Sequence, residues 1–184
     1  MKLLDAVNLV MPKLGERPVT SLAIKHPTLA VLLPLITQCR RETLLRGWWF
    51  NKYATTLYPD NSGNITVGTA TLSFVPDTAG EAVMRGTNLF NPADLTGVFS
   101  AAIQGVVTQD VEFDELPESA AKYVFYSSLV DAYATDIGVT QELAVWQAKA
   151  GQAWSDLIAE HLRQSKFNTR QRRAWASLIA AKNA

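Results

Sequence analysis

The sequence predicts an α+β fold: a small α-helical bundle with an inserted region of short strands and a basic C-terminal helix. Apolar residues recur every three or four positions before residue 47 and after residue 117, which is the helical period. Between residues 48 and 112 they alternate or form short runs separated by turn formers, as in strands. We therefore expect one domain over residues 1–184, with N-terminal helices (1–47), a β-insert (48–112), bundle helices (113–165) and a basic C-terminal helix (166–184).

Two helices are predicted in the N-terminal segment. The first covers residues 3–14, and Gly15 is placed to end it. The second covers residues 28–46 and ends at Gly47, because a glycine often closes a helix in the left-handed conformation. Since proline lacks the N–H that a helix interior requires, Pro34 either bends this helix or marks its true start.

The β-insert is predicted to form a small twisted sheet. The turn formers of the sequence YPDNSGN separate its first strand from the next one. The expected strands are residues 48–57, 65–67, 71–75, 82–85, 88–90 and 104–112.

Three helices are predicted after the β-insert. The first begins after Pro117, has a stripe of small and apolar residues, and ends at Gly138. The second covers residues 140–164 and places two tryptophans on one face, which argues for deep packing. The last covers residues 169–182 and follows a basic first turn. The two stripes are Ala121, Phe125, Ser128 and Ala132, and Leu143, Trp146, Ala150, Trp154, Leu157 and His161.

Composition and motifs exclude several classes of function. The 17 basic and 17 acidic residues of the 184 balance, unlike a wholly basic nucleic-acid binder. Phosphate-binding glycine loops and the G-x-S-x-G elbow are absent. One cysteine, Cys39, and two histidines, His26 and His161, cannot build the usual structural zinc site, so we expect Cys39 to be a small buried residue. The longest apolar run, residues 29–36, is too short to span a membrane, and we expect no membrane contact, cofactor or enzymatic activity.

One cluster of carboxylates leaves an alternative open. Alternation along a strand would put Asp110, Glu112 and Asp114 on one face, where three carboxylates could hold a divalent cation. The chain would then be a DNA-end-associated factor or a metal-dependent nuclease. Common metal-dependent nucleases also place a lysine two residues after an acid, and none of the eight lysines here has that spacing. We therefore favour a solvated strand face that leads into an acidic helix start, without a metal.

The charges are segregated along the chain. Residues 1–52 carry eight basic and three acidic side chains, residues 77–118 one basic and eight acidic, and residues 161–184 six basic and no acidic side chains. Such zones suit contacts with oppositely charged protein surfaces, including a second copy arranged head to tail. A basic C-terminus that touches phosphates is the alternative, and it predicts binding that weakens steeply with salt. The candidate interface residues are Arg163, Lys166, Arg170, Arg172, Arg173 and Trp175.

Four short motifs carry a family resemblance. They are residues 14–22 (LGERPVTSL), 46–51 (RGWWFN), 85–91 (RGTNLFN) and 113–118 (FDELPE). In order and spacing they resemble the tail tubular protein A family of short-tailed bacteriophages, over about residues 3–135.

The resemblance implies a structural adaptor of the head-to-tail connector rather than an enzyme. It implies a ring, usually a dodecamer, under the portal protein, with the tail nozzle protein docked below and genomic DNA passing through without sequence-specific binding. The protein would belong to the virion tail and would be assembled in the host cytoplasm.

Two of the motifs also have a structural interpretation. We expect Gly47 to end a helix, with Trp48 and Phe50 on one face of the following strand and Trp49 and Asn51 on the other. The second motif should start a helix after a strand. The positions expected to determine the fold are Arg46, Gly47, Trp48, Trp49, Phe50, Asn51, Leu116, Pro117 and Glu118.

Overall fold

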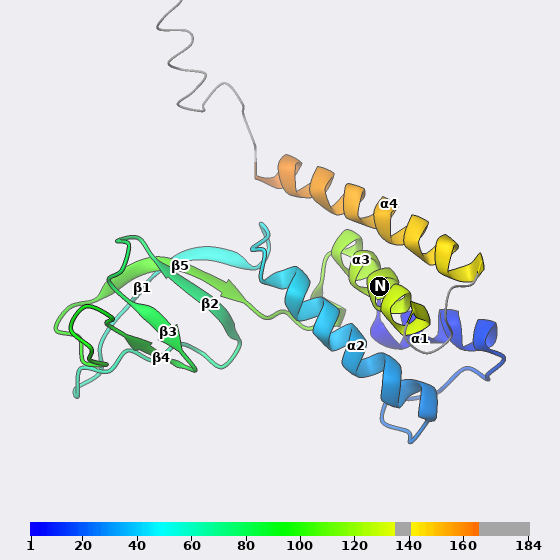
Figure 1. Ribbon diagram of the computed structural model, residues 1–184, viewed down its shortest axis with the longest axis horizontal. Helices are drawn as coiled ribbons and strands as arrows, with labels where there is room; N and C mark the ends of the chain where they lie inside the picture. Colours follow the sequence, from blue (N-terminus) through cyan, green and yellow to red (C-terminus); the bar gives the residue numbers. More distant parts are fainter. Residues whose placement is uncertain (135–140, 166–184) are drawn as a thin grey trace, which may run out of the picture.

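The computed structural model describes residues 1–134 and 141–165 and confirms the α+β prediction. Two parts follow one another along the longest axis of the molecule (Figure 1). At one end, strands between residues 52 and 109 form what we call the β-module; at the other end, helices form the helical bundle. The β-module is inserted between two helices of the bundle, as the sequence predicts.

The helical bundle is built from helices that come before and after the β-module. The described helices are α1 (Leu3–Val10), α2 (Pro27–Leu44), α3 (Glu118–Ala132) and α4 (Gln141–Gln164), with 3-10 turns at Met11–Leu14 and Phe113–Glu115. Helix α3 packs against both α2 and α4 (Figure 1). One hydrophobic cluster joins all four helices, and its fully buried side chains include Val7, Met11, Ile36, Phe125 and Leu157.

The first predicted helix is shorter in its α-helical part than expected. It is α-helical to Val10 and continues as a 3-10 turn. Pro12 has no N–H to donate to the carbonyl of Asn8. The Asn8 side chain exchanges two hydrogen bonds with the backbone of Val19, at 2.8 and 2.9 Å, which folds the following segment back onto α1. The helix ends at Gly15, as predicted, with a left-handed φ of 75°.

Helix α2 runs through Pro34, so the prediction that this proline starts the helix is wrong. The helix begins at Pro27 instead, in the first turn, where a missing N–H is not needed for a helical hydrogen bond. Pro34 is exposed on the surface of α2.

The β-module contains a three-stranded antiparallel sheet and a hairpin. The sheet consists of β1 (Lys52–Leu57), β5 (Ile103–Gln109) and β2 (Thr71–Pro76), with β5 in the centre, and β3 (Val83–Arg85) pairs with β4 (Asn88–Phe90) in the hairpin. Gly105 lies where β5 meets β2, and a Cβ there would lie 2.4 Å from the Val75 carbonyl oxygen and 2.6 Å from the Phe74 ring. Only glycine lets Phe74 close over the sheet at this point.

The β-module has its own hydrophobic cluster, separate from that of the helical bundle. Its buried members are Ile65, Val67, Phe74, Ala82, Leu89, Phe99, Ile103 and Val107. The rigidity of each part therefore comes mainly from its own core.

Three predicted strands differ from the structure. The strand expected over residues 48–57 begins at Lys52, and the one expected over 104–112 ends at Gln109. Residues 65–67 form only isolated bridges, in which Thr66 pairs with Asn88 next to a bridge between Asn64 and Val98. The predicted helix end at Gly138 and the predicted helix over residues 169–182 lie outside the described residues. Within the described ranges, no helix is both long and apolar enough to cross a bilayer.

Candidate functional site

The motif at residues 46–51 forms the first of two chain connections between the helical bundle and the β-module. Gly47 follows the end of α2 with a left-handed φ of 72°, and a Cβ there would lie 2.8 Å from Cδ of Lys52. Glycine thus suits both the backbone and the space, as predicted. The next residues make a turn, because the Asn51 N–H donates to the Trp48 carbonyl at 3.2 Å. The strand-like alternation that was expected here is therefore wrong.

The buried side chain of Asn51 joins three backbone segments. Its Oδ1 accepts a hydrogen bond from the Trp48 N–H at 2.7 Å. Its Nδ2 donates to the carbonyls of Leu44 and Gln109 at 3.0 and 2.8 Å. These groups belong to the end of α2, the turn and the end of β5, so one amide fastens both connections. The sequence placed Asn51 on a strand face and missed this role, although the preference of asparagine for turns was a signal.

Trp48 and Trp49 lie beside the C-terminal part of α4. Trp48 is buried, its Nε1 donates to the Thr43 carbonyl at 2.8 Å, and its ring meets Trp154 and His161 edge-on at centroid distances of 5.5 and 5.3 Å. Trp49 lies 5.9 Å from His161 and 4.9 Å from Phe50. Trp48 therefore packs in the core, as expected, and is not a platform for stacking bases.

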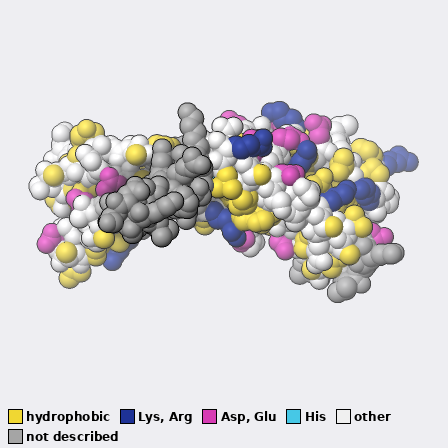
Figure 2. Space-filling view, turned by 90° about the horizontal axis from the view of Figure 1, so that it is seen from above, with side chains coloured by type: hydrophobic (Ala, Val, Ile, Leu, Met, Phe, Trp, Pro, Cys, Tyr) yellow, Lys and Arg dark blue, Asp and Glu magenta, His cyan; other side chains and the backbone are white. Residues whose placement is uncertain are grey.

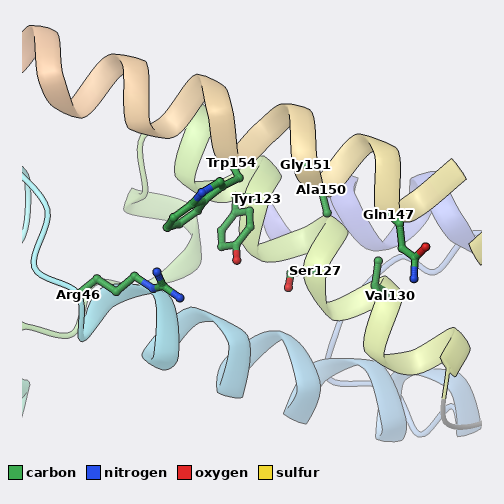
Figure 3. A pocket seen from close by; sticks show the side chains of 8 residues that line it. All are labelled: Arg46, Tyr123, Ser127, Val130, Gln147, Ala150, Gly151 and Trp154. Carbon is green, nitrogen blue, oxygen red and sulfur yellow. The ribbon is translucent and has the colours of Figure 1, made fainter. Parts of the chain in front are cut away.

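An open groove of about 440 Å³ lies between α3 and α4 and reaches the end of α2 (Figure 3). The Arg46 guanidinium lies over the Trp154 ring at 4.7 Å, and the Tyr123 ring lies 4.8 Å from the same tryptophan. Ala150 and Gly151 line the α4 side of the groove (Figure 3). The lining contains one cation and no acidic side chain, so the groove offers a contact surface and no acid–base pair.

The second connection is held by a buried arginine. Arg40 of α2 donates through Nη2 to Asp110 at 3.2 Å and through Nη1 to Glu112. Arg41 adds an ion pair to Asp110 at 3.6 Å. The carboxylates come directly after β5, so the salt bridges fix the chain where it returns from the β-module to α3.

The proposed metal cluster is not assembled. Asp110 and Glu112 face Arg40, whereas Asp114 accepts a hydrogen bond from the Leu3 N–H at 2.7 Å. The expectation that three carboxylates share a strand face is wrong, because β5 ends before the first of them. Within residues 1–134 and 141–165, no three His, Cys, Asp or Glu side chains come together in a group that could hold a metal ion.

The acidic zone of the sequence is partly neutralised in three dimensions. Besides Asp110 and Glu112, Asp114 lies 3.9 Å from Nζ of Lys2 and Glu118 pairs with Lys122 at 3.3 Å. Glu118 also accepts a hydrogen bond from the N-terminal ammonium, which, together with Lys122, holds the pKa of its carboxyl below the ordinary value. The zone therefore serves to attach its own chain to α1 and α2.

The motif at residues 116–118 starts a helix, as predicted. Leu116 is buried, Pro117 precedes the first turn of α3 with ψ of 148°, and Glu118 occupies that turn, where a carboxylate meets the positive end of the helix.

Cys39 is buried in α2, as expected. Burial and a contact of 3.3 Å between its Sγ and the Asp131 carboxylate raise the pKa of the thiol to about 12. A thiol held in its protonated form is a poor nucleophile.

Only the first of the candidate C-terminal interface residues is described. Arg163 is exposed near the end of α4, and its Nε donates to the Ala159 carbonyl at 3.4 Å. The others, Lys166, Arg170, Arg172, Arg173 and Trp175, lie outside the described residues.

Comparison with known proteins assigns the family. A family model described as "Tail tubular protein" matches residues 4–167. The chain is also 29% identical over 175 residues to tail tubular protein A of Klebsiella phage KP34, covering 94% of each chain. Proteins of this kind are structural components of the virion tail and work in a complex with other phage proteins. The chain therefore belongs to the tail tubular protein family.

Proposed function

We propose that the chain is a non-enzymatic adaptor of a phage head-to-tail connector. It assembles as a ring, a dodecamer by its family resemblance, beneath the portal protein. The ring provides the docking platform for the tail nozzle protein and lines part of the channel through which genomic DNA passes. Assembly takes place in the host cytoplasm, before the protein becomes part of the virion tail.

The observation that carries this proposal is the division of the chain into two fastened parts with different surfaces. Most of the visible Lys and Arg side chains lie over the helical bundle (Figure 2). Between residues 53 and 109, one basic residue, Arg85, accompanies Asp60, Asp77, Glu81 and Asp94. An adaptor must contact unlike neighbours at fixed relative positions, and complementary charge sets the register of such contacts. The two connections at Asn51 and Arg40 keep the surfaces in one arrangement.

Native mass spectrometry tests the ring and its attachment. We expect the purified chain, mixed with the portal protein of the same phage, to give a stoichiometric complex with about as many adaptor copies as a closed cyclic ring requires. A chain that stays monomeric with the portal present would contradict the proposal.

The basic C-terminal segment is proposed as the portal contact. Reversal of Arg170, Arg172 and Arg173 to glutamate should weaken portal attachment at least tenfold, because the uninterrupted positive charge of residues 161–184 is then lost. A charge-matched control reverses Arg17, Lys25 and Arg85, which lowers the net charge by the same amount. Equal weakening by both variants would show a general charge effect and would contradict the assignment.

A further inference from the structure

The outer edge of β1 is an unprotected sheet edge. All six residues of β1 pair with β5, from Lys52 opposite Thr108 to Leu57 opposite Ile103, without a break in register. Among the described residues, β1 has backbone hydrogen-bond partners on β5 alone. Its sequence, KYATTL, contains no proline, no bulge and a single charge at one end. Monomeric proteins normally block such an edge with these devices.

The opposite edge of the same sheet is protected. Strand β2 carries a register shift between Thr71 and Ser73 and ends in Pro76, which has no N–H to offer. Strand β3 also packs beside β2. The two edges of one sheet thus differ, and only β1 is suited to receive another strand.

We propose that β1 binds an extended segment of the tail nozzle protein, which adds a fourth strand to the sheet. A second copy of this chain is a poorer occupant. Copies in a cyclic ring meet through two unlike surfaces, whereas β1 against β1 makes a two-fold pair, and β2 is blocked. Since the proposed function gives the portal to the basic C-terminal segment, the nozzle is left for β1, and in this respect the inference rests on the proposed function.

The side chains of β1 define the chemistry of the incoming strand. Tyr53 and Leu57 lie opposite buried Val107 and Ile103, so the face that they share continues the apolar side of the sheet. Lys52 supplies the only charge. The segment that fits has about six extended residues, apolar side chains at alternate positions and a carboxylate near Lys52.

Hydrogen exchange measured by mass spectrometry tests the inference on the full chain. In the complex with purified nozzle protein, we expect amides of residues 52–57 to exchange at least tenfold more slowly than in the chain alone. Amides of β2 serve as the internal control and should not change. Protection of β1 by the portal protein, or by self-association without a partner, would overturn the assignment.

Two adjacent proline substitutions, Ala54→Pro and Thr55→Pro, form a matched pair. Neighbouring residues in a strand direct their N–H groups to opposite edges, so one variant loses a bond to β5 and the other only the bond to the partner. The second kind should melt like the unmodified protein and bind the nozzle protein at least tenfold more weakly. If neither variant folds, the exchange experiment still decides.

The outcomes separate the inference from the proposed function. Nozzle binding with unchanged β1 exchange, or undiminished binding by a folded proline variant with the normal melting temperature, would overturn the inference alone. An unmodified chain that binds neither the portal nor the nozzle protein would overturn both.

Discussion

Replacement of Asn51 by alanine should lower the free energy of unfolding by about 3 kcal/mol. The Trp48 N–H would lose the acceptor that it meets at 2.7 Å, and the Gln109 carbonyl would lose its side-chain donor. The Leu44 carbonyl would keep the Gly47 N–H at 3.0 Å. A buried backbone group left without a partner costs about 1–3 kcal/mol, and two such groups give the estimate.

Urea denaturation followed by tryptophan fluorescence and far-ultraviolet circular dichroism measures this loss. Asn91→Ala is the matched control, because the Asn91 side chain also makes three hydrogen bonds, with Ala93 and Asp94, but on an exposed loop. Water can replace those bonds, so we expect a loss of about 1 kcal/mol or less. A difference between the two variants below about 1 kcal/mol would refute the role given to Asn51.

Three further predictions concern single side chains. Asp110→Ala should cost about 2–3 kcal/mol in urea denaturation and Glu112→Ala under about 1 kcal/mol, because the first carboxylate is 19% and the second 77% exposed; equal losses would contradict this. The pKa of Cys39 is raised from 9.0 to about 12, so stability is fully present below pH 9 and declines from there toward pH 12, as the thiol ionises in the unfolded chain first. Urea midpoints at pH 8 and 10.5 should show a smaller alkaline decline for Cys39→Ala, and identical declines would exclude the thiol as a cause. Leu95 has a left-handed φ of 54°, so Leu95→Gly should raise the urea midpoint by up to about 1 kcal/mol in stability, whereas a lower midpoint would be the contrary result.

Features set by neighbouring residues were predictable from the sequence. Gly15 and Gly47 end their helices because the left-handed conformation is a local property of glycine. The strand at Asn88–Phe90 has the predicted bounds, since a short apolar alternation after Gly86 suffices to define a hairpin strand.

Features set by distant contacts were not predictable. Asn51 bonds to a carbonyl 58 residues away, and Arg40 bonds to a carboxylate 70 residues away. These contacts replace strand with turn at residues 48–51 and end β5 before Asp110. The same holds for the groove, because Arg46 and Trp154 come from opposite ends of the sequence and only the packed helices bring them together.

The way in which the β-module is attached has a mechanical consequence. Both connections belong to β1 and β5, which are adjacent and paired up to Lys52 and Thr108. A body attached along one line can swing about that line but resists twisting and sliding. Asn51 and Arg40 brace this hinge from the side of α2, so their hydrogen bonds set its stiffness. A load applied to the β-module would reach the helical bundle through these two side chains and the two peptide connections beside them.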